Sequence, residues 1–295
     1  MNEATTELRD SVKRLSRDLA KAGATLSDQE ARFLVDSYYT VQDDRIRSAS
    51  QLRALEKSGE PNELLGWLTD QSSILEQQIV RALDKYTDAH KMGSWMREIF
   101  GIGPIISAGL LANISMTHWK CNGTGKHNCK EGEPCTASCG MITLETVGHI
   151  WRYAGLDPTV KWEKGKKRPW NAALKTLCWK IGQSFMKFST NPKCFYGHLY
   201  LQRKQFEIER NDRGDNKELA KQLSEKVGRF TEAYKHLSEG KLPPGQIDAR
   251  ARRYAVKIFL SHMHAEWYRR EFGKEPPKPF AIAVLGHAHM IEAPH

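Results

Sequence analysis

The sequence predicts a mainly α-helical protein with a helical N-terminal module, a helix-hairpin-helix core domain, a cysteine-rich loop insert and a long C-terminal helix. Three observations predict this class. Apolar residues recur every three or four positions near the start of the chain, which gives one apolar stripe on a charged helix. Ser27 and Glu30 form a capping box before a second such helical pattern, and Pro243-Pro244-Gly245 opens the last long helix. We expect three domains, which span residues 1–92, 93–192 and 193–295.

The composition excludes a disordered tail and a membrane span. Of the 295 residues, 40% are hydrophobic and 27% are charged, and the mean hydropathy is −0.59. The longest apolar run is far too short to cross a bilayer. Residues 1–4 lack the basic start of a secretory signal, so we expect a cytoplasmic protein, nucleoid-associated in a bacterial or phage setting. Its cysteines should then be thiols or metal ligands.

The N-terminal module is predicted to hold two or three antiparallel helices. The first carries its apolar stripe from Leu8 to Leu19 and ends near Gly23. The second follows the capping box and ends where Gly59-Glu60-Pro61 interrupt the pattern, and a third spans about 62–89. The module shows no chemistry of its own. We therefore expect it to serve packing, with a homodimer through these helices as its possible assembly.

Residues 93–114 have the pattern of a helix-hairpin-helix. A short helix over 94–99 is followed by Phe100-Gly101-Ile102-Gly103-Pro104 and by a helix of small residues over 105–114. The two glycines permit a tight turn, and proline suits the first turn of a helix. Backbone N–H groups at such a helix start can hold a phosphate oxygen, although an ordinary helix–turn–helix corner is the alternative. The predicted contacts are Gly101, Ile102, Gly103 and Ile105.

A cysteine-rich insert follows at residues 119–140. It has too little apolar content to form a core, so four thiolates around one structural Zn²⁺ would supply the missing folding free energy. Spacings of seven, five and three intervening residues differ from the paired Cys-x-x-Cys of common zinc ribbons, and disulfides or unligated thiols are the alternatives. His118 and His127 are possible substitute ligands. The predicted metal ligands are Cys121, Cys129, Cys135 and Cys139.

The chain is basic, with 45 Lys and Arg against 35 Asp and Glu and a net charge of +10. This balance favours polyanionic partners, because cations that bind phosphates release counterions. The excess is concentrated between Arg152 and Lys187. Two tryptophans flank four cations there, a mixture that nucleic-acid surfaces use; a solvated surface with core tryptophans is the alternative. The predicted contacts outside the hairpin are Trp162, Lys164, Lys166, Lys167, Arg168, Arg250, Arg252 and Arg253.

The rest of the chain also shows helical patterns. Asn171 is predicted to cap a helix that ends near Phe188, a charged helix follows Pro192, and residues 219–240 are amphipathic. The last helix is expected over about 246–272. The remaining cysteines and histidines singled out in this part of the chain are expected to serve packing, capping or surface roles more than metal binding. They are Cys178, Cys194, His262, His264, His287 and His289.

Two runs, in this order, carry a resemblance to a known family. The first is Phe100-Gly101-Ile102-Gly103-Pro104-Ile105 and its continuation to Ile114, and the second ends in Ala154-Gly155-Leu156-Asp157-Pro158. They resemble the C-terminal domain of the Piv/MooV class of insertion-sequence transposases, in which a Gly-Ile-Gly-Pro hairpin precedes an Ala-x-Leu-Leu-Ala helix and, later, a Gly-Leu-x-Pro turn. The match covers about residues 93–190, and the helix from Arg250 resembles the family's closing helix. The resemblance implies a helical DNA-binding domain.

The sequence departs from this family where the family has its chemistry. The family's RuvC-like N-terminal domain carries four metal-binding acidic residues on an α/β sheet, whereas residues 1–92 are predicted as helices. The family also has a nucleophilic serine after the Gly-Leu-x-Pro turn, whereas residues 159–176 contain no serine. Thr159 is the hydroxyl nearest to Pro158, and Ser184 lies in the next predicted helix. We therefore assign no catalytic residue.

These observations predict a nucleic-acid-binding protein, with DNA as the favoured ligand, that is related to a transposase domain but lacks its catalysis. Phosphate contacts of this kind position a protein without reading base sequence. One alternative is a transposase or recombinase component whose strand cleavage or joining depends on a partner, on Thr159 or on Ser184. Another is a protein-interaction scaffold based on the N-terminal helices. RNA also stays open as the ligand, because a basic loop with tryptophans could stack unpaired bases.

Overall fold

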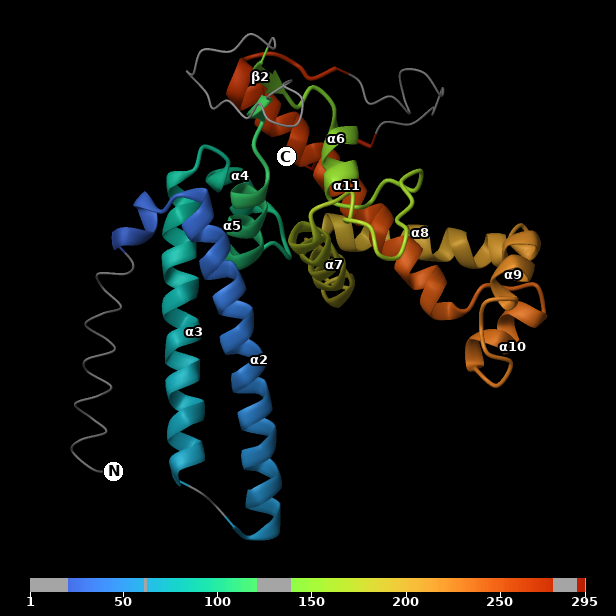
Figure 1. Cartoon of the computed structure of the whole chain (residues 1–295), viewed down its shortest axis with the longest axis horizontal. Coiled ribbons are helices and arrows are strands. Elements are labelled where there is room, and N and C mark those ends of the chain that lie inside the picture. Colours follow the sequence, from blue (N-terminus) through green and yellow to red (C-terminus); the bar gives the residue numbers. More distant parts are fainter. Residues whose placement is uncertain (1–20, 61–62, 121–138, 278–290, 295) are drawn as a thin grey trace. The chain divides into compact units, whose positions relative to one another are not determined.

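The computed structural model describes residues 21–60, 63–120, 139–277 and 291–294 (Figure 1). These residues form ten α-helices, one short 3₁₀ helix and one two-stranded sheet, which confirms the mainly α class. None of the helices in these ranges combines the length and the apolar character needed to cross a membrane. The chain divides into two compact units, Met1–Ser115 and Met116–His295, and this boundary differs from those expected after residues 92 and 192.

The first unit is built on two long antiparallel helices, α2 (Asp28–Ser58) and α3 (Glu63–Ala89), with the 3₁₀ helix η1 (Gly23–Thr25) packed against α3 (Figure 1). The predicted capping box starts α2. Ser27 Oγ accepts the Glu30 N–H at 3.3 Å, and the Ser27 N–H donates to Glu30 Oε2 at 2.8 Å. The predicted first helix falls in residues 1–20, which lie outside the described residues.

Two shorter helices, α4 (Gly93–Glu98) and α5 (Pro104–Asn113), complete the first unit. α4 packs against α3, and α5 packs against both α2 and α3, with Leu110 fully buried. At Gly93 a Cβ would lie 2.0 Å from the carbonyl oxygen of Thr87, so this close approach requires glycine. The segment that follows residue 92 thus belongs to the same unit as the N-terminal helices, which is why the unit boundary lies later than expected.

The second unit is organised around α11 (Pro244–Phe272), the longest of its helices (Figure 1). Three buried rings, Phe185, Tyr196 and Phe259, meet around it with centroid separations of 5.0 to 5.6 Å. Aromatic pairs at such separations add to the free energy gained from burying apolar area. The helices that pack on α11 are α6 (Val147–Tyr153), α7 (Ala172–Lys187) and α8 (Phe195–Asp212).

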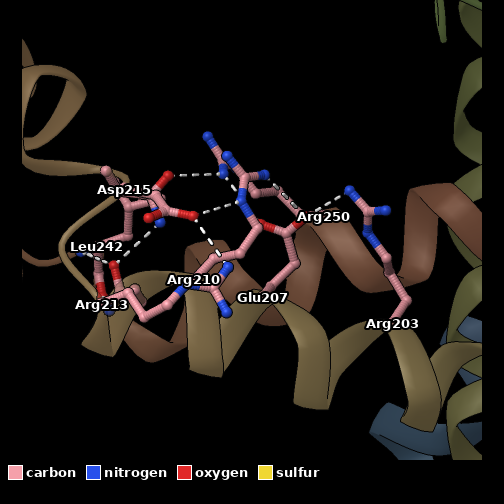
Figure 2. Close-up of polar contacts among 9 residues, drawn as sticks. Arg203, Glu207, Arg210, Arg213, Asp215, Leu242 and Arg250 are labelled. Atoms are coloured by element: carbon pink, nitrogen blue, oxygen red, sulfur yellow. Dashed lines mark hydrogen bonds and ion pairs between the residues drawn. The ribbon is translucent and has the colours of Figure 1, made fainter.

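Two short helices, α9 (Lys217–Ser224) and α10 (Glu232–Ser238), stand where one amphipathic segment was expected over 219–240. They share a small apolar cluster with Leu242 and Ile247. Beside this cluster Glu207, only 1% exposed, joins arginines of α8 and α11 in one network (Figure 2). Its carboxylate lies 2.5 Å from Arg203 Nη2 and 3.1 Å from Arg250 Nη1. The Arg203 pair lies within α8, and the Arg250 pair ties α8 to α11.

The sheet consists of β1 (Thr117–Lys120) and β2 (Gly140–Thr143), which pair antiparallel with Lys120 opposite Gly140. The sequence analysis expected no strand here. Neither strand is long enough to show an alternating pattern, and their pairing joins residues separated by the whole cysteine-rich insert. The hairpin closes the insert at its base. Residues 121–138, with Cys121, Cys129 and Cys135, lie outside the described residues.

Candidate nucleic-acid interface

A pocket of about 440 Å³ opens in the second unit, and we call it the basic pocket. One wall is the turn 155–158, and the others are faces of α7 and α11. The α11 residues in its wall are spaced by three and four positions, so they share one face of that helix. The lining residues include Leu156, Asp157 and Pro158 of the turn, Lys175 and Trp179 of α7, and Arg252, Arg253 and Val256 of α11.

The turn that lines the pocket is held by its backbone. Gly155 has φ +64°, in the left-handed region, and a Cβ there would lie 2.9 Å from Trp170 Cγ. The Leu156 N–H donates to the Trp151 carbonyl at 2.8 Å. The start of α7 is fixed as predicted, because Asn171 Oδ1 accepts the Leu174 N–H at 3.0 Å. The turn 155–158 and Lys175 of α7 therefore lie beside the same pocket.

Three cations converge on the pocket. Lys175 Nζ lies 3.9 Å from the ring centroid of Trp170, and Arg252 Nη2 pairs with Asp248 Oδ2 at 2.7 Å. The Nε and Nη1 atoms of Arg252 are buried and have no hydrogen-bond partner among the described residues. Within the same ranges Arg253 makes no ion pair. The pocket wall thus holds more positive charge than the described residues neutralise.

The pKa directions agree with this excess of positive charge. Burial lowers the pKa of Lys175, and the charges of Arg168 and Arg253 lower it further. Desolvation on partial burial lowers the pKa of Arg253, and repulsion from Arg250 and Arg252 lowers it further. An arginine stays charged at neutral pH in spite of such a shift. A bound anion would relieve this repulsion, so the geometry suits a phosphate.

Asp157 is the one carboxylate in the pocket wall. It accepts the backbone N–H of Thr159 at 2.9 Å and the Thr159 hydroxyl at 2.7 Å, which is the pattern of an Asx turn. These hydrogen bonds lower the pKa of Asp157, and the charges of Arg152 and Lys257 act in the same direction. A carboxylate with a lowered pKa is a weak proton acceptor. The pair Thr159–Asp157 therefore shapes the turn and is a poor nucleophile–base arrangement.

Trp179 lines the pocket and is largely exposed. Its side chain is 60% exposed, the highest value among the large exposed tryptophans of the described residues. The sequence analysis missed it. The signal was available, because Leu174, Leu177, Ile181 and Phe185 are buried and define the opposite face of α7.

The predicted basic loop is exposed. Trp162 is 41% exposed, its Nε1 donates to the Lys166 carbonyl at 2.7 Å, and Arg168 Cζ lies 5.8 Å from its ring centroid. Lys166 pairs with Glu163 at 2.7 Å, and both side chains are largely in solvent, so this pair has little energetic weight. Lys164 and Lys167 have no ion pair within the described ranges. Trp170 instead packs between Gly155 and Lys175.

The structure separates the three predicted α11 arginines. Arg252 and Arg253 line the pocket, whereas Arg250 Nη1 bonds to Glu207 Oε2 at 3.1 Å and to Asn216 Oδ1 at 3.2 Å (Figure 2). Helix geometry separates Arg250 from Arg252, which projects to nearly the opposite side, but not from Arg253, which projects within about 60° of it; the bonds of Arg250 make the difference. The charge of Arg250 is therefore used inside the protein, and we leave it out of the interface.

The predicted hairpin contacts lie in the first unit. The Ile102 N–H donates to the Ile99 carbonyl at 3.0 Å, and the side chains of Ile102 and Ile105 are buried. Gly101 has φ +93°, which the tight turn requires, and Gly103 precedes α5 in an extended conformation. The turn is tight, but the N–H of Ile102 bonds within the turn itself, and the helix-hairpin-helix stays a prediction. Phosphate binding through Gly101, Gly103 and Ile105 stays a prediction.

The predicted zinc site is described only at its edge. Of the four cysteines, Cys139 alone lies within the described residues, directly before β2. No group of three or more His, Cys, Asp or Glu side chains that could hold a metal occurs among the residues that the structure describes. Cys178 and Cys194 are buried, as expected, and burial raises the pKa of Cys178 to about 12.

No protein-family model, curated protein or solved structure matches this chain. The function is therefore inferred from the residues of the pocket and of the basic loop.

Proposed function

We propose that this chain is a nucleic-acid-binding protein whose ligand is DNA and which contacts the phosphate backbone through the basic pocket and the basic loop. One observation carries the proposal: Lys175, Arg252 and Arg253 converge from two helices on one pocket whose wall holds a single carboxylate. The loop cations Lys164 and Lys167 would extend the contact along a strand. Such contacts neutralise phosphates without reading base sequence.

The transposase resemblance is part of this proposal. The Gly155-Leu156-Asp157-Pro158 turn, which carries half of that resemblance, forms one wall of the basic pocket. The hydroxyl nearest to this turn, on Thr159, donates to a carboxylate with a lowered pKa. We therefore favour a DNA-binding protein without strand cleavage over a recombinase component.

A salt-series binding assay tests the proposal. Duplex DNA, single-stranded DNA and RNA of one length would be titrated with the full chain between low and moderate salt. Each neutralised phosphate contributes about 0.9 to the log–log slope for a duplex, so several contacts give a steep dependence. A flat slope, or no binding to any of the three, would refute the proposal.

Matched charge variants make the assay specific for the pocket. Arg253→Gln should weaken binding and reduce the slope by about 1. Lys221→Gln removes the same charge from the exposed face of α9 and should leave affinity and slope unchanged. Equal losses for both variants would mean that net charge alone, and not the basic pocket, attracts the nucleic acid.

A further inference from the structure

The indole of Trp179, 60% exposed, is the more exposed of two largely exposed tryptophans of the second unit, the other being Trp162 at 41%. Trp267 of the same unit is 4% exposed, and the rings of Trp151 and Trp170 are covered by Lys257 and Lys175 at 4.2 and 3.9 Å. Leaving most of a tryptophan in water forgoes a large gain in burial free energy. An exposed aromatic side chain that lines a cavity beside cations can serve as a platform on which a base stacks.

The pocket has two chemical characters. Its cations suit a phosphate, and Leu156, Pro158 and Val256 add an apolar surface beside Trp179. A free phosphate ion would use only the first of these. A nucleotide would use both, because it joins an anion to a flat, weakly polar base. The volume of about 440 Å³ lies within the range of about 300–1,000 Å³ typical of small-ligand sites.

We propose that the basic pocket takes one unpaired nucleotide of a DNA strand, with its phosphate at Lys175 and Arg253 and its base stacked on Trp179. This inference rests on the proposed function and names the form of DNA that the pocket selects. Bases within a duplex already stack on both faces, so the indole could not reach them unless a nucleotide were unpaired or turned out of the helix. Duplex DNA would contact cations but not the indole of Trp179.

The packing of α7 on α11 holds Lys175 and Trp179 of α7 close to Arg252 and Arg253 of α11. A Cβ on Gly182 would lie 3.2 Å from Arg252 Cβ and 3.5 Å from Val256 Cγ2, so the glycine lets the helices approach closely. Asp248 holds one nitrogen of Arg252, and the two buried nitrogens without a hydrogen-bond partner in the described residues face no competing acceptor. Arg252 thus adds fixed positive charge behind the phosphate position.

The test compares Trp179→Ala with Phe230→Ala, which removes a fully exposed aromatic side chain of the same unit. Labelled single-stranded DNA and a duplex of the same sequence serve as ligands. We expect Trp179→Ala to weaken single-strand binding about 5- to 100-fold, the usual loss for one stacked base, and to change duplex binding by less than about twofold. Phe230→Ala should change neither, and Trp179→Phe should keep most of the single-strand affinity.

A second readout reports stacking directly. A strand with 2-aminopurine should lose fluorescence on binding to the unchanged protein and much less on binding to Trp179→Ala. Equal effects of Trp179→Ala on both ligands, or no effect on either while both still bind, would overturn the inference and leave the proposed function standing. Failure of the unchanged protein to bind any nucleic acid would instead remove the proposed function, and the inference with it.

Discussion

The Glu207 carboxylate of α8 and the Arg250 guanidinium of α11 form an ion pair of 3.1 Å in which the Glu207 side chain is only 2% exposed (Figure 2). Arg203 and Arg210 approach the same carboxylate at 2.5 and 3.8 Å. Three arginines therefore share one buried negative charge, and Arg210 also pairs with Asp215 at 3.3 Å. The pair also explains why Arg250 does not line the basic pocket, although Ala249 and Arg253 on either side of it do.

Replacing this carboxylate should destabilise the second unit strongly. Glu207→Gln keeps the shape of the side chain but leaves the arginines without their shared counter-charge, and removing one partner of a buried pair costs about 3–5 kcal/mol. The free energy of unfolding from urea titration measures the loss. Glu232→Gln breaks an exposed pair with Lys235 and should cost less than about 0.5 kcal/mol. Similar losses for both variants would contradict a structural role for the network.

The same carboxylate should make stability depend on pH. Burial acts to raise the pKa of Glu207, but the hydrogen bond from Arg250 and the charge of Arg203 outweigh it, and the net pKa lies below its ordinary value. A group with a lowered pKa stabilises the folded state above its unfolded pKa of about 4.3 and loses this contribution as the pH falls through the folded pKa. The difference in unfolding free energy between the unchanged protein and Glu207→Gln should therefore shrink below pH 4. A constant difference down to pH 2.5 would refute this linkage.

Local patterns predicted much of the fold, and non-local pairings did not. The capping box of Ser27 and Glu30 and the cap at Asn171 appeared where expected, because their hydrogen bonds join residues three positions apart. The pairing of Lys120 with Gly140 was missed, since it joins two residues that are far apart in the sequence.

The candidate site was predicted in part for the same reason. Composition identified the basic loop and the α11 arginines, but it could not tell which side of a helix meets another element. Only the packing of α7 and α8 on α11 separates Arg253, which lines the pocket, from Arg250, which binds Glu207. Trp179 was missed although the apolar stripe of α7, which contains Leu174 and Ile181, places it on the opposite side of that helix.

Gly155→Ala should disturb the pocket wall. The new Cβ would lie 2.9 Å from Trp170 Cγ at a residue with φ +64°, so both a clash and backbone strain oppose it, at a cost of about 1–3 kcal/mol. Gly165→Ala is the control, because Gly165 has φ +89° but open space around it. Thermal unfolding should show the larger loss for Gly155→Ala, and single-strand affinity should fall only in that variant. Equal losses would mean that the contact with Trp170 contributes nothing.

Zinc binding by the cysteine-rich insert is tested through Cys139, at the closed base of the β1–β2 hairpin. If the four predicted cysteines hold one Zn²⁺, the chain purified under reducing conditions should contain about one zinc per molecule, and Cys139→Ser should lower that content several-fold. Cys178→Ala should leave it unchanged, because Cys178 is buried in α7. A chain without zinc by elemental analysis would favour the unligated-thiol alternative.

Asp157→Asn separates a binding role of the pocket from a catalytic one. Asparagine keeps an oxygen that can accept both hydrogen bonds of Thr159, at 2.9 and 2.7 Å, so the turn should persist. The change also removes the one negative charge of the pocket wall. For a phosphate-binding pocket, affinity for single-stranded DNA at low salt should therefore rise about two- to tenfold, and the salt dependence should steepen. If Asp157 instead activated Thr159 in strand cleavage, supercoiled DNA would be cut by the unchanged protein and left intact by Asp157→Asn.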